Sequence, residues 1–158
     1  MATTVTAADL NVTITESITL NGVVYGNTKT STITTNTKAE QRIMNIAGRG
    51  AGGDEYTTIV GFGTADSASD VRAADFKYVR ITNLDSATDL TLRLNNGTDF
   101  VYMPVEAGDS IVLMGSGIDH TATSGGDAAN TLVAFTAIAA QAQHASTSVD
   151  IEFLVVTA

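Results

Sequence analysis

Four short strands in a row, separated by turn sequences, constrain the fold of this chain more than any other feature. They lie in the run FKYVRITNLDSATDLTLRLNNGTDFVYMPVEAGDSIVLM, from Phe76 to Met114. Leu90, Leu92 and Leu94 alternate with polar residues, and because strand side chains point to opposite faces in turn, the leucines line one face. The connections LDSATD, NNGTD and EAGD are rich in Asn, Asp and Gly, which favour turns. We therefore expect a four-stranded meander with one buried and one wet face.

An earlier segment, NVTITESITL, alternates in the same way. Residues of one parity are apolar apart from Glu16, namely Val12, Ile14, Ile18 and Leu20. Asn21-Gly22 favours the type I′ turn of a two-residue hairpin, so the chain after it should fold back on Ile18–Leu20. Residues 26–37 are mostly Thr, Ser and Asn, a composition typical of an exposed edge strand or an extended arm.

Further strand candidates are RIMNIA (residues 42–47) and YTTIVGF (56–62), with the loop GRGAGGD between them. Residues 64–75 form a polar connection with a possible helical turn at 69–74. Residues 130–143 fit a helix or a strand, and we favour a strand because a hairpin joins it economically to the closing strand VDIEFLVV. The pattern predicts an all-β fold: one antiparallel β-sandwich or jelly-roll-like domain, residues 11–158, with an extended polar N-terminal region and an arm at residues 1–10.

Composition restricts the partners. The chain of 158 residues is in the single-domain range and has no cysteine, which excludes disulfides and thiolate metal sites. Its net charge of −9 argues against a nucleic-acid partner, since binding phosphates requires positive charge. No segment approaches the roughly 20 apolar residues of a membrane span, and the first residues lack the regions of a signal peptide. We expect a protein made in the cytoplasm of its host, with no membrane partner.

Candidates for chemistry are few. Residues 48–53 match G-x-G-x-x-G, but a dinucleotide site needs a helix next, and a strand candidate follows, which favours a flexible hairpin loop. His120 and His144 lie in polar loops without a matched nucleophile, so solvated loop histidines are favoured over catalysis. Five aspartates could offer oxygen ligands to calcium, but turn formation explains them better: Asp66, Asp70, Asp75, Asp85 and Asp89. We predict no catalytic, cofactor-binding or metal-binding residue and no cofactor. The absence of tryptophan lowers the case for a sugar-binding module.

The run from Phe76 onward, and the chain end VDIEFLVVTA, resemble small virion structural proteins of tailed bacteriophages. The resemblance covers about the C-terminal half, in the phrases I-T-N before L-x-L-R-L, P-V-E-A-G-D-S-I-V-L and V-D-I-E-F. It implies a β-rich protein of the capsid or tail, present in many copies.

The expected function is therefore that of a non-enzymatic capsid decoration, or cement, protein on the capsid surface of the virion. Its partners would be the major capsid protein or other virion proteins, and it would form a homo-oligomer, with a trimer favoured. We see no sign in the sequence of the long hairpin that a tail-tube subunit needs, which favours decoration over a tail role. A tail, fibre or adaptor component of the virion and a carbohydrate-binding jelly-roll module are the alternatives.

Overall fold

The computed structural model describes residues 6–50, 55–63, 70–72, 75–97, 100–114, 119–121 and 132–158. These residues form an all-β structure whose strands pair antiparallel, except for one parallel pair, β6 with β7. The strands, in chain order, are β1 (Ala8–Thr15), β2 (Ile18–Leu20), β3 (Val23–Tyr25), β4 (Thr28–Asn36), β5 (Lys38–Ile46), β6 (Thr57–Gly63), β7 (Asp70–Arg72), β8 (Phe76–Asn83), β9 (Leu90–Asn95), β10 (Phe100–Val105), β11 (Ser110–Met114), β12 (Asp119–Thr121), β13 (Leu132–Ala134), β14 (Ala137–Ala142) and β15 (Val149–Thr157).

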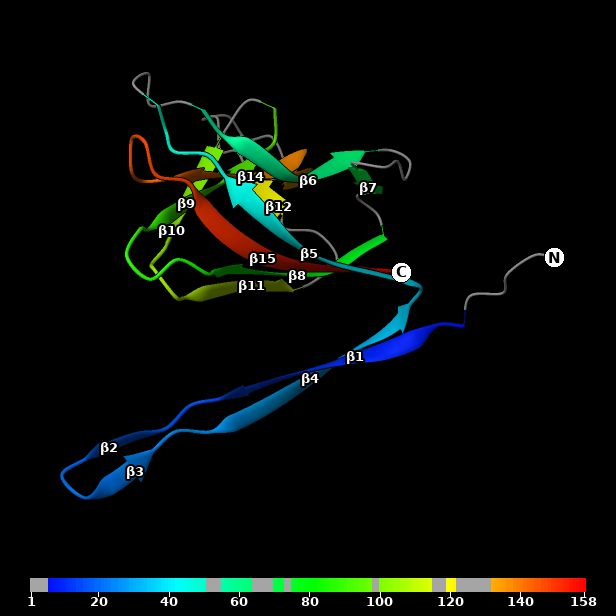
Figure 1. The fold of residues 1–158 in the computed structure, drawn as a ribbon. Coiled ribbons are helices and arrows are strands. Elements are labelled where there is room, and N and C mark those ends of the chain that lie inside the picture. The colour runs from blue at the N-terminus through cyan, green and yellow to red at the C-terminus, as the bar shows by residue number, and fades with distance from the viewer. Residues whose placement is uncertain are drawn as a thin grey trace.

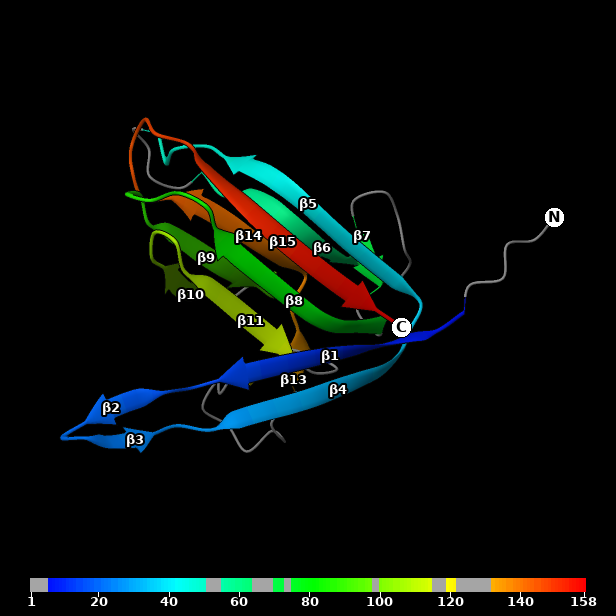
Figure 2. The ribbon, with the colours of Figure 1, turned by 60° about the horizontal axis from the view of Figure 1, so that its bottom comes forward.

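Two sheets make up the body of the molecule and face each other (Figures 1 and 2). Their strand orders are β10-β9-β14-β6-β7 and β11-β8-β15-β5. One hydrophobic core lies between them and takes side chains from both. Leu90 and Leu92 of the first sheet and Ile81 and Ile151 of the second are 0% exposed. Since each such side chain contributes about 1.5–3 kcal/mol by leaving water, this shared core is what holds the two sheets together.

The four expected strands between Phe76 and Met114 are all present as β8, β9, β10 and β11, but the expected meander is wrong. Only β9 and β10 pair as chain neighbours, whereas β8 pairs with β11 and with β15 in the opposite sheet. The chain therefore changes sheet between β8 and β9 and again between β10 and β11. Alternation determines which face of a strand is buried, but it does not determine which strand lies beside it, and loops of this length can cross the ~10 Å between packed sheets.

Other connections differ from expectation for the same reason. The ambiguous segment is extended as predicted but forms two strands, β13 and β14, and β14 and β15 lie in different sheets and form no hairpin. The glycine-rich loop likewise joins strands of different sheets, β5 and β6, so the interpretation as a hairpin loop is wrong. Where a helical turn was expected, Asp70–Arg72 forms β7 beside the end of β6.

One buried side chain, Asn83, forms hydrogen bonds with both loops at which the chain changes sheet between Phe76 and Met114. Asn83 is 0% exposed, and its amide donates hydrogen bonds to the carbonyl oxygens of Thr88 (2.9 Å), Val105 (3.3 Å) and Glu106 (3.2 Å). Its carbonyl oxygen accepts from the Asp85 N–H (3.0 Å). The loop after β8 and the loop after β10 are thus fastened to one residue, the Asn of the I-T-N phrase.

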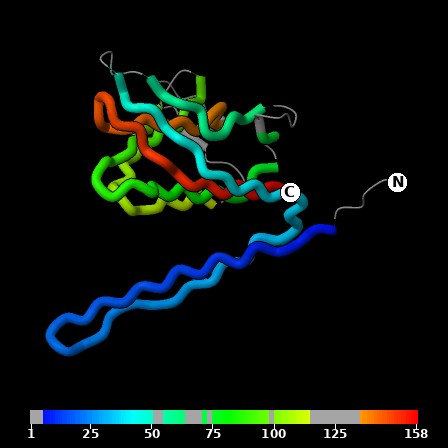
Figure 3. Tube along the Cα trace, viewed as in Figure 1, coloured from blue at the N-terminus to red at the C-terminus, as the bar shows by residue number. Residues whose placement is uncertain are grey.

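The most conspicuous departure from a compact body is a long hairpin at the N-terminal side. Strands β1 and β4 pair along their length, and β2 and β3 continue the hairpin to a turn at Asn21-Gly22, with φ angles of 51° and 78° as a type I′ turn requires. We call residues 8–36 the arm. It projects away from the two packed sheets, and its turn lies farthest from them (Figure 3). The expectation of no long hairpin is wrong: residues 11–36, which were assigned to the β-sandwich domain, form most of this hairpin instead.

The arm extends on both sides of the boundary predicted at residue 10. The chain passes from the arm into the body at Thr37, whose N–H donates to the Thr157 carbonyl oxygen (3.0 Å), and β5 begins at the next residue. The predicted hairpin between Ile18–Leu20 and Val23–Tyr25 is confirmed, and so is the exposed character of residues 26–36.

Candidate interaction surfaces

The two long strands of the arm present chemically different faces. One face is a ladder of hydroxyl and amide side chains, in which hydrogen bonds join Thr13 to Thr30 (3.0 Å), Thr28 to Thr15 (3.2 Å) and Thr32 to Asn11 (2.8 Å). The opposite face carries Leu10, Val12 and Ile14, with Ile33 across from Leu10. This apolar face has the alternation of a core strand, yet Ile14 is 46% exposed.

The end of the arm, residues 18–25, is the most apolar exposed surface in the described part of the chain, and we call it the arm tip. Its large side chains are all about half exposed or more: Ile18 54%, Leu20 54%, Val23 51%, Val24 69% and Tyr25 53%. An isolated two-stranded hairpin is marginal in water, and an exposed hydrophobic patch indicates a contact with another molecule. The arm tip is therefore the first candidate site for binding a partner.

Charge is distributed unevenly between the arm and the rest of the chain. Of 17 acidic and 8 basic residues, the arm holds Asp9, Glu16 and Lys29, and residues 17–28 hold none. The remainder of the chain therefore carries most of the net charge of −9. Two bodies of this charge repel each other, whereas the uncharged arm tip approaches either body without that cost.

A second uncovered surface lies on the outer face of the β10-β9-β14-β6-β7 sheet. Because Leu92 and Leu94 point into the core, their neighbour Arg93 points outward, opposite Tyr102 of β10. The Arg93 guanidinium lies 4.1 Å from the ring centre of Tyr56 and 5.0 Å from that of Phe100. The Tyr102 ring lies 6.1 Å from Tyr56 and 6.2 Å from Phe100. We call these four residues the aromatic patch.

The aromatic patch combines exposed rings with an under-satisfied cation. Phe100 is 45% exposed and Tyr102 54%, on the edge strand β10. The Arg93 Nε is buried without a hydrogen-bond partner, and Arg93 forms no ion pair with the residues that the structure describes. Tyrosine and arginine are the residue types that most often dominate binding energy at protein interfaces. The patch is thus the second candidate site.

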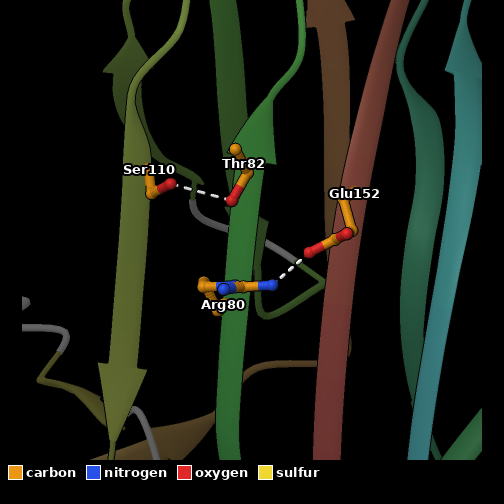
Figure 4. Close-up of polar contacts among 4 residues, drawn as sticks. All are labelled: Arg80, Thr82, Ser110 and Glu152. Carbon is orange, nitrogen blue, oxygen red and sulfur yellow. Dashed lines mark hydrogen bonds and ion pairs between the residues drawn. The ribbon is translucent and has the colours of Figure 1, made fainter. Parts of the chain in front are cut away.

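The outer face of the other sheet carries the polar contacts drawn in Figure 4. Arg80 of β8 forms an ion pair with Glu152 of β15, and the Thr82 and Ser110 hydroxyls are hydrogen-bonded at 2.8 Å. Beside this group, burial raises the pKa of the Tyr78 phenol, and the charge of Arg80 lowers it in part. The Arg80 Nε, like that of Arg93, is buried without a hydrogen-bond partner, and the same face carries Ile43, 67% exposed, and Met114, 42% exposed.

The described part of the glycine-rich motif packs against the loop after β14. The N–H groups of Arg49 and Gly50 donate to the carbonyl oxygens of His144 and Ala145, both at 3.1 Å. A Cβ on Gly48 would lie 2.8 Å from the His144 oxygen, so close backbone approach explains this glycine. Residues 51–54 lie outside the described residues, and the strand β6 follows them.

The two histidines differ in what can be said of them. His144 is exposed, and its Nδ1 accepts from the N–H groups of Ser146 (3.3 Å) and Thr147 (3.2 Å), which is the role of a turn residue. His120 belongs to β12, but its side chain lies outside the described residues.

The aspartates considered for calcium serve local structure where they are described. The Asp85 carboxylate accepts hydrogen bonds from the N–H groups of Ala87 (2.8 Å) and Thr88 (2.7 Å). These bonds, that of Ala87 first, hold the pKa of the Asp85 carboxyl below its ordinary value. The Asp89 carboxylate accepts a hydrogen bond from the Ala107 N–H (3.1 Å). Asp75 lies 3.7 Å from Arg72, whereas Asp66 and the side chain of Asp70 lie outside the described residues. Within the described ranges no three His, Asp or Glu side chains gather as a metal site would need, and no helix there is long and apolar enough to cross a membrane.

Neither candidate surface was predicted from the sequence. The parity of Val12 to Leu20 was a signal for the arm, since two alternating segments around Asn-Gly make a hairpin, but it was read as part of the core. The aromatic patch joins residues far apart in the chain and had no local signal. Comparison with known proteins finds no match among family models, curated proteins or solved structures.

Proposed function

We propose that this chain is a non-enzymatic structural protein of a virion, present in many copies, whose arm binds a neighbouring subunit. The arm tip carries the proposal, because five large apolar side chains there are about half exposed or more in the single chain. A protein that works alone gains nothing from such a surface, which costs solubility and stability, whereas a subunit of an assembly buries it.

We also infer that the body is a jelly roll, and the strand pairing supports this. Its eight longer strands, in chain order, are β5, β6, β8, β9, β10, β11, β14 and β15. The first pairs with the last, the second with the seventh, the third with the sixth and the fourth with the fifth. This is the pairing of one long antiparallel ribbon wrapped into two sheets, the arrangement of viral capsid and lectin domains.

The resemblance of the C-terminal half to virion proteins of tailed phages supports the viral class of jelly roll over the lectin class. Within the virion we propose a decoration protein at the capsid surface, binding the major capsid protein or other virion proteins and made in the host cytoplasm. A homo-oligomer, with a trimer favoured, suits the arm because closed symmetric association is the common way to bury such a surface.

A tail component is the second candidate, and the arm favours it. A tail-tube ring needs long hairpins that reach between subunits, and their supposed absence was the ground for preferring decoration. Because the arm is such a long hairpin, this argument against a tail role no longer holds.

Particle incorporation tests the proposed function. Quantitative mass spectrometry of purified virions should find the chain in many copies. Particles made with Leu20→Asp should lose it, whereas Thr30→Asp, the same added charge on the hydroxyl face of the arm, should be incorporated normally. Absence of the wild-type chain from virions, or equal incorporation of both variants, contradicts the proposal.

A further inference from the structure

We propose that the arm tip of one copy docks on the aromatic patch of a second copy, in a head-to-tail contact. This inference rests on the proposed function and names the partner of the same surface: another copy of this chain. Glu16 at the base of the tip then lies against Arg93 at the centre of the patch.

The shape of the chain prevents the tip from reaching its own patch. The arm leaves on the side of the β11-β8-β15-β5 sheet, whereas the patch is on the outer face of the opposite sheet (Figures 1 and 2). At about 3.3 Å per residue the returning strand from Asn21 to Asn36 spans about 50 Å, more than the ~30 Å of the longest strands in the body. A tip that reaches past its own body meets the next subunit. Because donor and acceptor surfaces differ, repeated contacts close into a ring or extend as a filament.

The two surfaces are complementary in both apolar area and charge. Ile18, Leu20 and Tyr25 offer exposed apolar side chains, and Phe100 and Tyr102 offer exposed rings to cover them. Glu16 is the one acidic residue in the alternating apolar series, and it is exposed. Its carboxylate supplies the ion pair that Arg93 lacks among the described residues of its own chain. Opposite charges that meet at the edge of an apolar contact set its register.

The size of the arm fits a stable contact. A standard interface uses about 20–30 residues and about 800 Å² on each partner, and the arm from Ala8 to Asn36 has about 30 residues. Most of them are exposed, Asn36 at the base is buried, and four are half-buried: Leu10, Val12, Ser31 and Ile33. The arm tip and the apolar face of the arm can therefore supply one side of such an interface, while the hydroxyl face with Thr30 stays outside the contact.

Site-directed cross-linking tests the contact directly, since the chain has no cysteine of its own. Leu20→Cys and Tyr102→Cys proteins are purified separately, mixed so that subunits exchange, and oxidised. Disulfide-linked dimers are expected from the mixture and not from either protein alone. Thr30→Cys mixed with Tyr102→Cys is the matched control and should give none. Cross-linking of Leu20→Cys with itself, which means tip against tip, overturns the inference, and so does the absence of any cross-link in the mixture.

A charge exchange tests the pair of Glu16 and Arg93. Glu16→Arg and Arg93→Glu should each weaken subunit association by at least about ten-fold, and the double variant should recover most of it. Thermal melts of each variant show whether the body is still folded. A damaged fold cannot explain recovered association in the double variant. No recovery in the double variant contradicts the inference.

The proposed function and this inference fail in different ways. If Leu20→Asp dissociates the subunits while Arg93→Glu leaves them associated, the arm binds elsewhere and only the inference is wrong. If Leu20→Asp also leaves association unchanged, the arm is not the contact and both are wrong.

Discussion

Asn83 is the clearest case of a single residue that holds the fold at a change of sheet. It is fully buried and makes hydrogen bonds with both of its side-chain polar atoms. Its position was visible in the sequence as the end of a strand before a loop with two aspartates, but its role was not, because two of its partners, Val105 and Glu106, lie 22 and 23 residues further along the chain. Burial of an asparagine depends on the tertiary fold and carries no local pattern.

Replacing Asn83 by Asp should destabilise the body strongly. The change keeps the shape but turns the donating amide into a carboxylate oxygen that faces the carbonyl oxygens of Thr88 and Glu106. We expect the free energy of unfolding to fall by about 1–3 kcal/mol or more, measured by urea denaturation. Asn95→Asp is the control, since the Asn95 side chain accepts from the Gly97 N–H (2.6 Å) and Asp keeps that acceptor. Equal losses in the two variants would mean that the amide of Asn83 is not the important group.

The lowered pKa of Asp85 predicts that the stability of the folded protein depends on pH in the acid range. Hydrogen bonds from the N–H groups of Ala87 and Thr88 favour its charged form, so the pKa of this carboxyl lies below the ordinary value of about 3.9. Because the folded value is the lower one, the stabilisation is complete above the ordinary pKa and is lost as the pH falls through the folded pKa. An NMR titration of the Asp85 carboxyl checks this, and a midpoint at or above the ordinary value would contradict it.

At the scale of elements, the same alternating pattern has two different outcomes. In β9 it places leucines in the core, whereas in β1 it places Ile14 on an arm, where its side chain is 46% exposed. The sequence predicted strands at both places and the Asn-Gly hairpin between β2 and β3 correctly. It did not separate arm from core, because apolar alternation says that one face will be covered and not which chain covers it.

Two leucine truncations separate the elements. Leu92 is 0% exposed, so Leu92→Ala should lower the free energy of unfolding by about 2–5 kcal/mol through lost burial and a cavity. Leu20 is 54% exposed, so Leu20→Ala should leave the thermal melt of the body nearly unchanged and weaken association instead. Differential scanning calorimetry and light scattering measure the two effects. A melt lowered as much by Leu20→Ala as by Leu92→Ala would place the arm tip in the core.

For the whole molecule, composition and strand pattern predicted the all-β class correctly, while the connections between strands were largely mispredicted. Four connections expected to stay within a sheet cross between sheets instead: β5 to β6, β8 to β9, β10 to β11 and β14 to β15. Turn residues such as those of LDSATD and EAGD mark where a strand ends, and both a hairpin and a crossover need such an end. The choice between them depends on which partners bury the apolar faces best, a property of the complete chain.

The mass of the assembly in solution tests most directly the claim that the arm binds a second copy. Light scattering with size-exclusion chromatography on the full chain at micromolar concentration should give at least three times the 16.3 kDa of one chain. Leu20→Asp should give 16.3 kDa with an unchanged thermal melt, and Thr30→Asp should behave as the wild type. A wild-type mass of 16.3 kDa throughout the micromolar range would contradict the claim that the arm joins copies of this chain.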